Sequence, residues 1–505
     1  MLAAVATAIG VGTLLIRLIL HERSFDLFGD EVIYADIGRS VVDGGFPSFL
    51  GEPFFLHGPA FFYLEAGWSR IFGRPASLMA WVYEMRTLNC LLAGLTAVLL
   101  VLLATKVTRS LTAGTAAGLL FALDPFSIRQ NDRVLLETAM MFWILLGYQL
   151  LLSLADRSLS RSSTIRAASA GLIFGIGILV KDEAALITIL PLLCVVIFRW
   201  GFPRLLIGCT ITASVLPYAA YVAVVAEYGY GPGWWSAKTS GIKRLLGVVQ
   251  TTGFHSSGGG SLGGRLVAEG GNFVTTYVLL LAAVPAAWMM LRHGSALLRV
   301  VALFYCASAI TLAYAVSLGT LEEQELYLLS IPSMLVIPAG ITLFIRRRAS
   351  TPKHPTQGRA QRRNYSGSTV VMAGVLAVLL TLNLISSIQW LQQPDDGFSY
   401  LLPYLAKHTP PGTVIDLAAG APPPSQTDGG RYALEGTYSV SMWTTKSALA
   451  QNHVGYILAE WGPINEGYAF MSPSAVRALV SGTRMVFSRD GRTYGQLALY
   501  KVASP

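Results

Sequence analysis

Long apolar segments alternate with short polar ones over the first 390 residues of the chain. Eleven of these segments are long and apolar enough to cross a bilayer core, which takes roughly 20 helical residues. They lie near residues 1–20, 86–105, 111–126, 138–155, 166–180, 184–198, 205–226, 273–291, 300–317, 327–345 and 368–388. The pattern therefore predicts a polytopic α-helical membrane protein with about eleven transmembrane helices.

The first loop, residues 21–85, contains two further periodic stretches. Ile33, Ile37 and Val41 recur every four residues between charged positions, which predicts an amphipathic helix lying on the membrane. The stretch "GPAFFYLEAGWSRIFG" gathers aromatic residues, which prefer the headgroup level. We expect these two interfacial helices to frame a lateral entrance for a lipid.

The segment 391–505 has a different pattern and predicts a separate small α/β domain. The apolar runs stop, "MVFSRDGRTYGQLALYKV" predicts a hairpin with Asp490 and Gly491 in its turn, and "PSAVRALVSG" predicts a short helix. At about 115 residues the segment is long enough to bury its own core. Acceptor binding, a lid and plain structural support all remain open for it.

Charge decides how the chain crosses the membrane. Only 13% of the residues are charged, against about 25% in soluble domains, and the net charge is +9. Sixteen Lys and Arg lie in one set of alternating short loops, including a basic connector at 346–366, and three lie in the other set. Such basic residues are topology signals rather than a nucleic-acid surface. We therefore expect a plasma-membrane protein with a cytoplasmic amino terminus and the 391–505 domain outside.

The expected outer face holds the candidate chemistry. Asp30 and Glu31 follow the first span, and Glu137 begins an apolar run in a later outer turn. Charges at a helix end can simply reach water or favour the helix amino terminus, yet ionisable groups at membrane depth are functional candidates. Lys181 needs an anion, either Asp182 or Glu183 beside it or a lipid phosphate. Further candidates are Asp132 and Arg133 in the outer turn, and Lys238, Lys243 and Arg244 in a loop expected to be flexible over 227–272.

The four cysteines lie inside apolar runs without a C-x-x-C spacing, so they are expected to be packing residues. The carboxylates could instead bind a divalent cation such as Mg²⁺ or Mn²⁺ through Asp30, Glu31 and Glu137. Both uses of the carboxylates stay open.

The order of these motifs resembles the GT-C glycosyltransferases, and most nearly their family 39, the protein O-mannosyltransferase and aminoarabinose transferase branch. The resemblance rests on the Asp-Glu pair, "HGPAFFYLEAGWSRIFG", the "RVLLE" turn and "KDEA", in that order over residues 1–390. It implies a GT-C catalytic domain that moves a sugar from a polyprenyl-phosphate donor to a protein, lipid or cell-envelope glycan acceptor, usually with inversion. "HGP" departs from the paired prolines that the family has at this place, and His57 within it is a candidate substrate-binding residue.

In this resemblance Asp30 matches the family's catalytic base or acceptor-orienting acid, with Glu31 beside it, and Glu137 matches its second acid. Lys181 matches the cation that neutralises the departing phosphate. The chemistry is consistent, because a lipid phosphate is already a good leaving group and transfer needs a base and cations. A flippase or transporter for lipid-linked sugars is the alternative, although charges in paired halves at mid-membrane would then be expected. A membrane scaffold or sensor is a third possibility.

Overall fold

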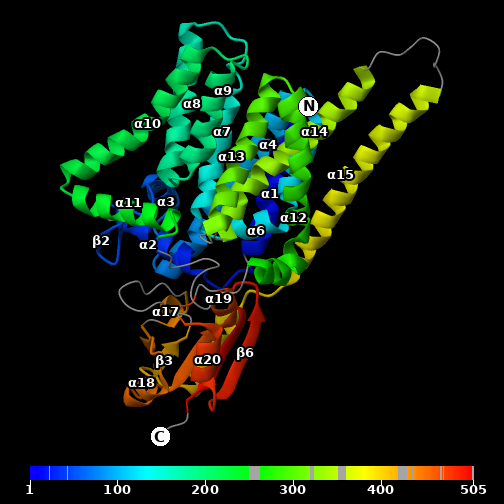
Figure 1. Ribbon diagram of the computed structural model, residues 1–505. Helices are drawn as coiled ribbons and strands as arrows, with labels where there is room; N and C mark the ends of the chain where they lie inside the picture. Colours follow the sequence, from blue (N-terminus) through cyan, green and yellow to red (C-terminus); the bar gives the residue numbers. More distant parts are fainter. Residues whose placement is uncertain are drawn as a thin grey trace.

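A computed structural model describes residues 1–21, 23–42, 44–248, 262–318, 323–350, 360–418, 429–434, 436–466, 469 and 471–502. Figure 1 shows a bundle of long helices with a small α/β domain at one end. The architecture of a multi-pass membrane protein with a small C-terminal domain is thereby confirmed.

All eleven apolar segments lie on helices. The helices of the bundle are α1 (Leu2–His21), α4 (Leu78–Thr108), α5 (Leu111–Ala122), α6 (Pro125–Asn131), α7 (Leu136–Leu151), α8 (Arg161–Val180), α9 (Ala184–Phe198), α10 (Arg204–Glu227), α12 (Leu262–His293), α13 (Ala296–Leu318), α14 (Leu326–Ser350) and α15 (Ala360–Gln392). Among the described residues, eight helices are long and apolar enough to span a membrane. The pair α5 and α6, bent by 63°, adds a ninth, whereas α7 and α9 are shorter apolar helices.

The bend between α5 and α6 falls at Asp124 and Pro125, where a side chain of α1 also contacts the end of α5. The buried guanidinium of Arg17 on α1 donates hydrogen bonds to the carbonyls of Phe121 and Ala122, each at 3.2 Å. These carbonyls belong to the last turn of α5, where no helical partner remains and a cation is favoured. Asp124 then caps α6 by accepting from the Ser127 N–H at 2.7 Å. The chain therefore changes direction without leaving these buried groups unpaired.

Both helices expected in the first loop are present. They are α2 (Gly29–Val42) and α3 (Ala60–Phe72), with the short strands β1 (Ser48–Phe49) and β2 (Glu52–Pro53) between them. α2 buries Ile37 and Val41, while α3 leaves Ile71 and Phe72 exposed. Two apolar side chains exposed at the end of α3 fit a helix that lies against lipid.

Two connections expected from the sequence are shorter than predicted. The flexible loop at 227–272 is wrong over much of its length, because it contains helix α11 (Gly231–Leu245) and the start of α12. Its glycine-rich part, residues 249–261, lies outside the described residues. Similarly, α14 and α15 extend into the basic connector at 346–366, of which residues 351–359 also lie outside the described part. Helices therefore replace parts of both expected loops.

The C-terminal domain is built on a five-stranded sheet of order β4-β3-β5-β7-β6. β3 is parallel to β4 and β5, and β7 is antiparallel to β5 and β6. Its elements are α16 (Gly397–His408), β3 (Val414–Leu417), α17 (Gly429–Leu434), β4 (Ser439–Ser441), α18 (Lys446–Gln451), β5 (Tyr456–Glu460), α19 (Trp461–Glu466), α20 (Pro473–Val480), β6 (Arg484–Gly491) and β7 (Gly495–Lys501). The expected hairpin and the helix at α20 are confirmed.

The hairpin turn lies later than predicted. Asp490 and Gly491 are still paired in the strand, opposite Gln496 and Gly495, so the turn consists of residues 492–494. The sheet has a separate apolar core on each face, since the neighbouring residues Ile457 and Leu458 of β5 belong to different clusters.

Candidate functional site

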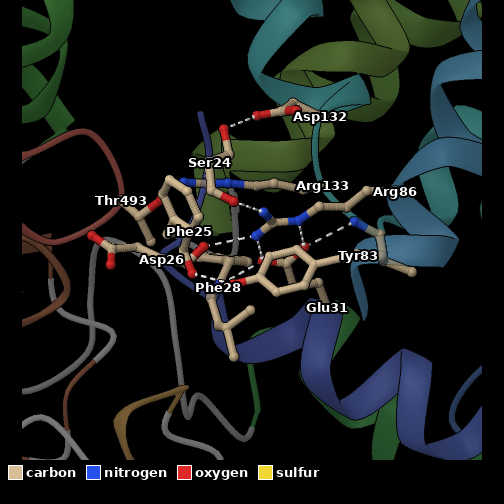
Figure 2. A network of polar contacts seen from close by, with 12 residues as sticks. Ser24, Phe25, Asp26, Phe28, Glu31, Tyr83, Arg86, Asp132, Arg133 and Thr493 are labelled. Atoms are coloured by element: carbon tan, nitrogen blue, oxygen red, sulfur yellow. Dashed lines mark hydrogen bonds and ion pairs between the residues drawn. The ribbon is translucent and has the colours of Figure 1, made fainter. Parts of the chain in front are cut away.

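The adjacent carboxylates Asp30 and Glu31 at the start of α2 have different surroundings. Glu31 is fully buried and pairs with Arg86 of α4 through two contacts, Nη2–Oε1 at 2.5 Å and Nε–Oε2 at 2.9 Å. Oε1 also accepts from the Phe28 N–H at 2.7 Å, and Oε2 from the Val134 N–H at 3.2 Å. Each carboxylate oxygen therefore accepts from two donors, and the Glu31 carboxylate joins α2 to Arg86 of α4 and to the backbone at Phe28 and Val134 (Figure 2).

Arg86 extends this contact along the loop that precedes Asp30. Its guanidinium also donates to the carbonyls of Ser24 at 2.5 Å and Asp26 at 2.7 Å. Arg86 was not a candidate from its sequence context, because it opens an apolar run of twenty residues. A charged residue in an apolar segment usually has a partner of opposite charge, so Arg86 together with the Asp-Glu pair was a usable signal for this contact.

Asp132 and Arg133 lie in the same network rather than beside Asp30. Asp132 accepts from the Ser24 hydroxyl at 2.5 Å, and the Arg133 guanidinium lies 4.4 Å from the ring centroid of Phe28 (Figure 2). Both side chains are buried. Their described contacts hold the first loop in place, and a role in substrate binding stays a prediction.

The C-terminal domain docks on this same loop. Asp26 accepts from the Gly397 and Phe398 N–H groups at 3.0 and 2.9 Å, at the start of α16, where a helix favours an anion. The Tyr494 hydroxyl donates to the Leu27 carbonyl at 2.5 Å. Burial, together with the nearby charge of Asp395, raises the pKa of Asp26 to about 7. The loop that leads to Asp30 is therefore fixed from both sides.

Asp30 itself faces a separate polar cluster and keeps part of its surface exposed. It accepts a hydrogen bond of 3.3 Å from the Gln324 side chain. Burial raises the pKa of Asp30, the charge of Glu137 raises it further, and the cations Arg244 and Lys181 oppose the shift. The structure thus brings Asp30, Glu137, Lys181 and Arg244 together, of which the order of motifs had pointed to the first three.

Cations in this cluster are held by acids. Lys181 Nζ lies 2.6 Å from Glu137 Oε1 and 3.4 Å from Glu183 Oε2. Of the two neighbours considered for Lys181, Glu183 is therefore a partner, whereas Asp182 pairs with Lys238 of α11. The closest partner, Glu137, was not foreseen because it lies 44 residues away.

His57 borders the same cluster. Its Nε2 lies 3.5 Å from the Tyr34 hydroxyl. Burial and the charges of Lys181, Lys238 and Arg244 hold the pKa of His57 well below its usual value, so the imidazole is neutral. A neutral histidine can donate and accept hydrogen bonds to a sugar without adding charge.

Three further residues complete the description. Lys243 is exposed on α11, next to Arg244. Gln324 and Glu325 precede α14 and were not selected from the sequence. Burial, with the charge of Glu183 nearby, raises the pKa of Glu325 to about 8, which places a second weak acid in the cluster. The signal that would have found them is the run "LEEQEL" between two spans.

The candidate metal ligands do not gather into one site. No group of three or more His, Cys, Asp or Glu side chains within the described ranges is placed to hold a metal ion. Glu31 is engaged by Arg86, and one oxygen of Glu137 is engaged by Lys181. A divalent cation at these carboxylates stays a prediction.

Comparison with known proteins gives the architecture a context. A family model described as dolichyl-phosphate-mannose-protein mannosyltransferase matches residues 68–226. A search of curated protein sequences found no match.

Similar folds occur in solved membrane proteins. The crystal structure of the apo oligosaccharyltransferase from Archaeoglobus fulgidus matches with a TM-score of 0.62 at 11% identity, covering 100% of this chain and 74% of that one. ArnT from Cupriavidus metallidurans, bound to undecaprenyl phosphate, matches with a TM-score of 0.56 at 13% identity, covering 98% of each chain. The archaeal oligosaccharyltransferase AglB from Archaeoglobus fulgidus, with an inhibitory peptide and a dolichol-phosphate, matches with a TM-score of 0.54 at 11% identity, covering 99% and 74%.

At identities of 11–13%, the solved structures show a shared fold only. The family model adds a sequence match over residues 68–226. The matched family and the archaeal neighbours are sugar-transferring enzymes by name. The resemblance stated from the sequence is confirmed: this chain has the membrane fold of the GT-C glycosyltransferases, and its residues 68–226 match the dolichyl-phosphate-mannose-protein mannosyltransferase family.

Proposed function

We propose that the protein transfers a sugar from a polyprenyl-phosphate donor to an acceptor hydroxyl on the outer face of the membrane, with inversion and with Asp30 as the base. The matched family is named for a dolichyl-phosphate sugar, and two similar structures contain undecaprenyl phosphate or dolichol-phosphate. These relatives support a lipid-linked donor for this chain.

The observation that carries the proposal is the contrast among the three candidate carboxylates. Glu31 is tied to Arg86 and Glu137 to Lys181, whereas Asp30 is partly exposed and accepts a long hydrogen bond from Gln324. Its raised pKa makes Asp30 a stronger base than an ordinary carboxylate. Asp30 is therefore the carboxylate best suited to take a proton from an incoming hydroxyl.

The reaction proceeds as one displacement. The acceptor oxygen attacks the anomeric carbon while Asp30 takes its proton, and the bond between that carbon and the phosphate oxygen breaks with its electron pair going to the phosphate. The lipid phosphate then carries an additional negative charge. Lys238 and Arg244 on α11, together with Lys181, supply the positive potential that stabilises it.

The test uses purified protein, radiolabelled polyprenyl-phosphate sugars and a crude membrane acceptor. Asp30→Asn is compared with Asp490→Asn, an exposed aspartate of β6 that serves as the matched control. We expect transfer to fall at least about 100-fold in Asp30→Asn and to persist in the control. Transfer measured with and without a chelator reports whether a divalent cation takes part.

Two outcomes would contradict the proposal. Equal transfer by wild type and Asp30→Asn would remove Asp30 from the chemistry. If no donor is consumed while labelled lipid crosses reconstituted vesicles equally well in both proteins, the chain is a transporter instead.

A further inference from the structure

The C-terminal domain has a cavity of about 510 Å³ that the proposed transfer reaction does not use. It lies between α19, α20 and β7, and its side chains include Trp461, Asn465, Arg477, Gln496 and Tyr500. In Figure 1, α19 lies at the end of the domain that faces the helical bundle.

The aromatic part of this cavity is held in a fixed orientation. Trp461 is the first residue of α19 and is partly buried, and its indole N–H donates to the Tyr500 hydroxyl at 3.2 Å. The next residue, Gly462, donates its N–H to the Tyr494 carbonyl at 2.7 Å. A Cβ at Gly462 would lie 2.8 Å from that carbonyl, so the close approach requires glycine. The indole is therefore set in place before any ligand arrives.

The polar side chains that line the cavity include Asn465, Arg477 and Gln496, each of which ends in a planar group. The Arg477 guanidinium lies 5.8 Å from the ring centroid of Trp461, and both Arg477 and Asn465 are exposed to solvent. Gln496 donates from its amide to the Ser488 hydroxyl at 3.0 Å, which fixes the orientation of its carboxamide. Arg477 is the one charged side chain in the described lining of the cavity.

We propose that this cavity binds a glycan. The C–H face of a sugar ring stacks on an aromatic ring, which supplies apolar contact with little conformational cost. Carboxamides and a guanidinium each present two groups in one plane, which suits the paired hydroxyls of a sugar. The volume accommodates one or two sugar residues, and the positive charge of Arg477 admits neutral or acidic sugars. A nucleotide could also stack on Trp461, so it is included in the test as a competing ligand.

The cavity lies close to the loop that carries Asp30. Gly495 lines it, and the adjacent Tyr494 bonds to Leu27, three residues before Asp30. We therefore assign the glycan to the acceptor of the transfer reaction. This assignment rests on the proposed function, whereas glycan binding itself does not.

Binding is measured first, without any donor, on the full chain in nanodiscs by isothermal titration. The probes are neutral mannose, galactose and arabinose oligosaccharides, an acidic uronate oligosaccharide, and AMP. Trp461→Ala and Arg477→Ala are compared with Trp443→Ala, an exposed tryptophan of the same domain outside the cavity. At least one oligosaccharide should bind wild type and Trp443→Ala equally, and the cavity variants at least about tenfold more weakly.

Trp461→Phe keeps an aromatic face and should retain most of the affinity, which protects the test against a variant that fails to fold. No oligosaccharide binding at millimolar concentration, equal binding by Trp461→Ala and wild type, or binding of AMP alone would each overturn the proposal.

The role in transfer is then tested separately. Asp30→Asn should bind the oligosaccharide as wild type does, and Trp461→Ala should raise KM for the acceptor at unchanged kcat. If glycan binds but no donor is consumed, the proposed function fails while the glycan site stands. If transfer occurs but KM is the same in Trp461→Ala, the site is not the acceptor site.

Discussion

Replacing Glu31 by glutamine tests whether the two neighbouring carboxylates have separate roles. Each oxygen of Glu31 accepts from one nitrogen of Arg86 and one backbone N–H, that of Phe28 or Val134. Whichever way the introduced amide is oriented, its NH₂ group faces two donors. Glu31→Gln therefore breaks contacts on one side and leaves Arg86 buried without its counter-charge.

The magnitude follows from burial. The side chains of Arg86 and Glu31 are 2% and 0% exposed, so solvent screens their interaction little. Removing one partner of such a buried pair typically lowers the free energy of unfolding by about 3–5 kcal/mol. That corresponds to roughly a 150- to 5,000-fold rise in the equilibrium for opening this region.

A thiol measurement reads out this opening locally. Cys90 is fully buried and lies one turn along α4 from Arg86. With Cys194, Cys209 and Cys306 replaced by serine, the rate at which a thiol reagent labels Cys90 in detergent reports the opening equilibrium. Glu31→Gln should raise this rate by the same factor, roughly 150- to 5,000-fold.

Asp30→Asn is the matched control, because it loses a carboxylate one residue away. It gives up one hydrogen bond of 3.3 Å from Gln324 and no ion pair with Arg86, so its labelling rate should change by less than about tenfold. Equal labelling of Glu31→Gln and Asp30→Asn would refute the division of roles.

Three further predictions concern pH and the cations. Because the pKa of Asp30 is raised and the base must be unprotonated, kcat/KM should fall as the pH drops through that raised pKa. Arg244→Gln removes a cation that lowers the pKa of Asp30, so the acidic side of the pH profile should move to higher pH. An unchanged pH profile in this variant would argue against Asp30 as the base. Burial raises the pKa of Glu65 on α3, so folding favours the protonated side chain and the stability that it contributes is lost as the pH rises. Glu65→Gln should therefore unfold at a higher temperature than wild type at pH 8 but not at pH 4. A difference in unfolding temperature that is independent of pH would contradict this. Lys238→Ala should raise KM for the donor at least about tenfold. Asp182→Asn leaves the Lys238 cation in place without its partner, so KM for the donor should not rise in this variant. Equal effects of the two substitutions on KM would indicate that the pair is purely structural.

The helices of the fold could be predicted because they depend on local pattern. A bilayer requires long apolar stretches, and the four-residue period of Ile33, Ile37 and Val41 marked α2 directly. The break between α5 and α6 was not predicted, although Asp124 and Pro125 interrupt the apolar run at that point. Arg17, which lies more than a hundred residues away, pairs with the carbonyls at the end of α5 only in the folded bundle, and the sequence gives no sign of this contact.

The candidate site was predicted in part for the same reason. The order of motifs identified Asp30, Glu137 and Lys181, and the structure brings these side chains into one cluster. Glu31, which was expected to act beside Asp30, instead pairs with Arg86, and this partner could not be predicted because it lies 55 residues away. Sequence order indicates which residues approach one another, but not which of two neighbouring side chains is already bound.

The docking of Tyr494 on Leu27 also determines when the site is completed during synthesis. These two residues are 467 positions apart, so at about 5–20 residues per second the loop that carries Asp30 is made roughly 20–90 seconds before its clamp. During that interval the early helices are already inserted, while the strand pair that fixes the loop does not exist. We expect Asp30 of a newly made chain to reach its final position only after the C-terminal domain has folded. The protein should therefore become active only after its translation is complete.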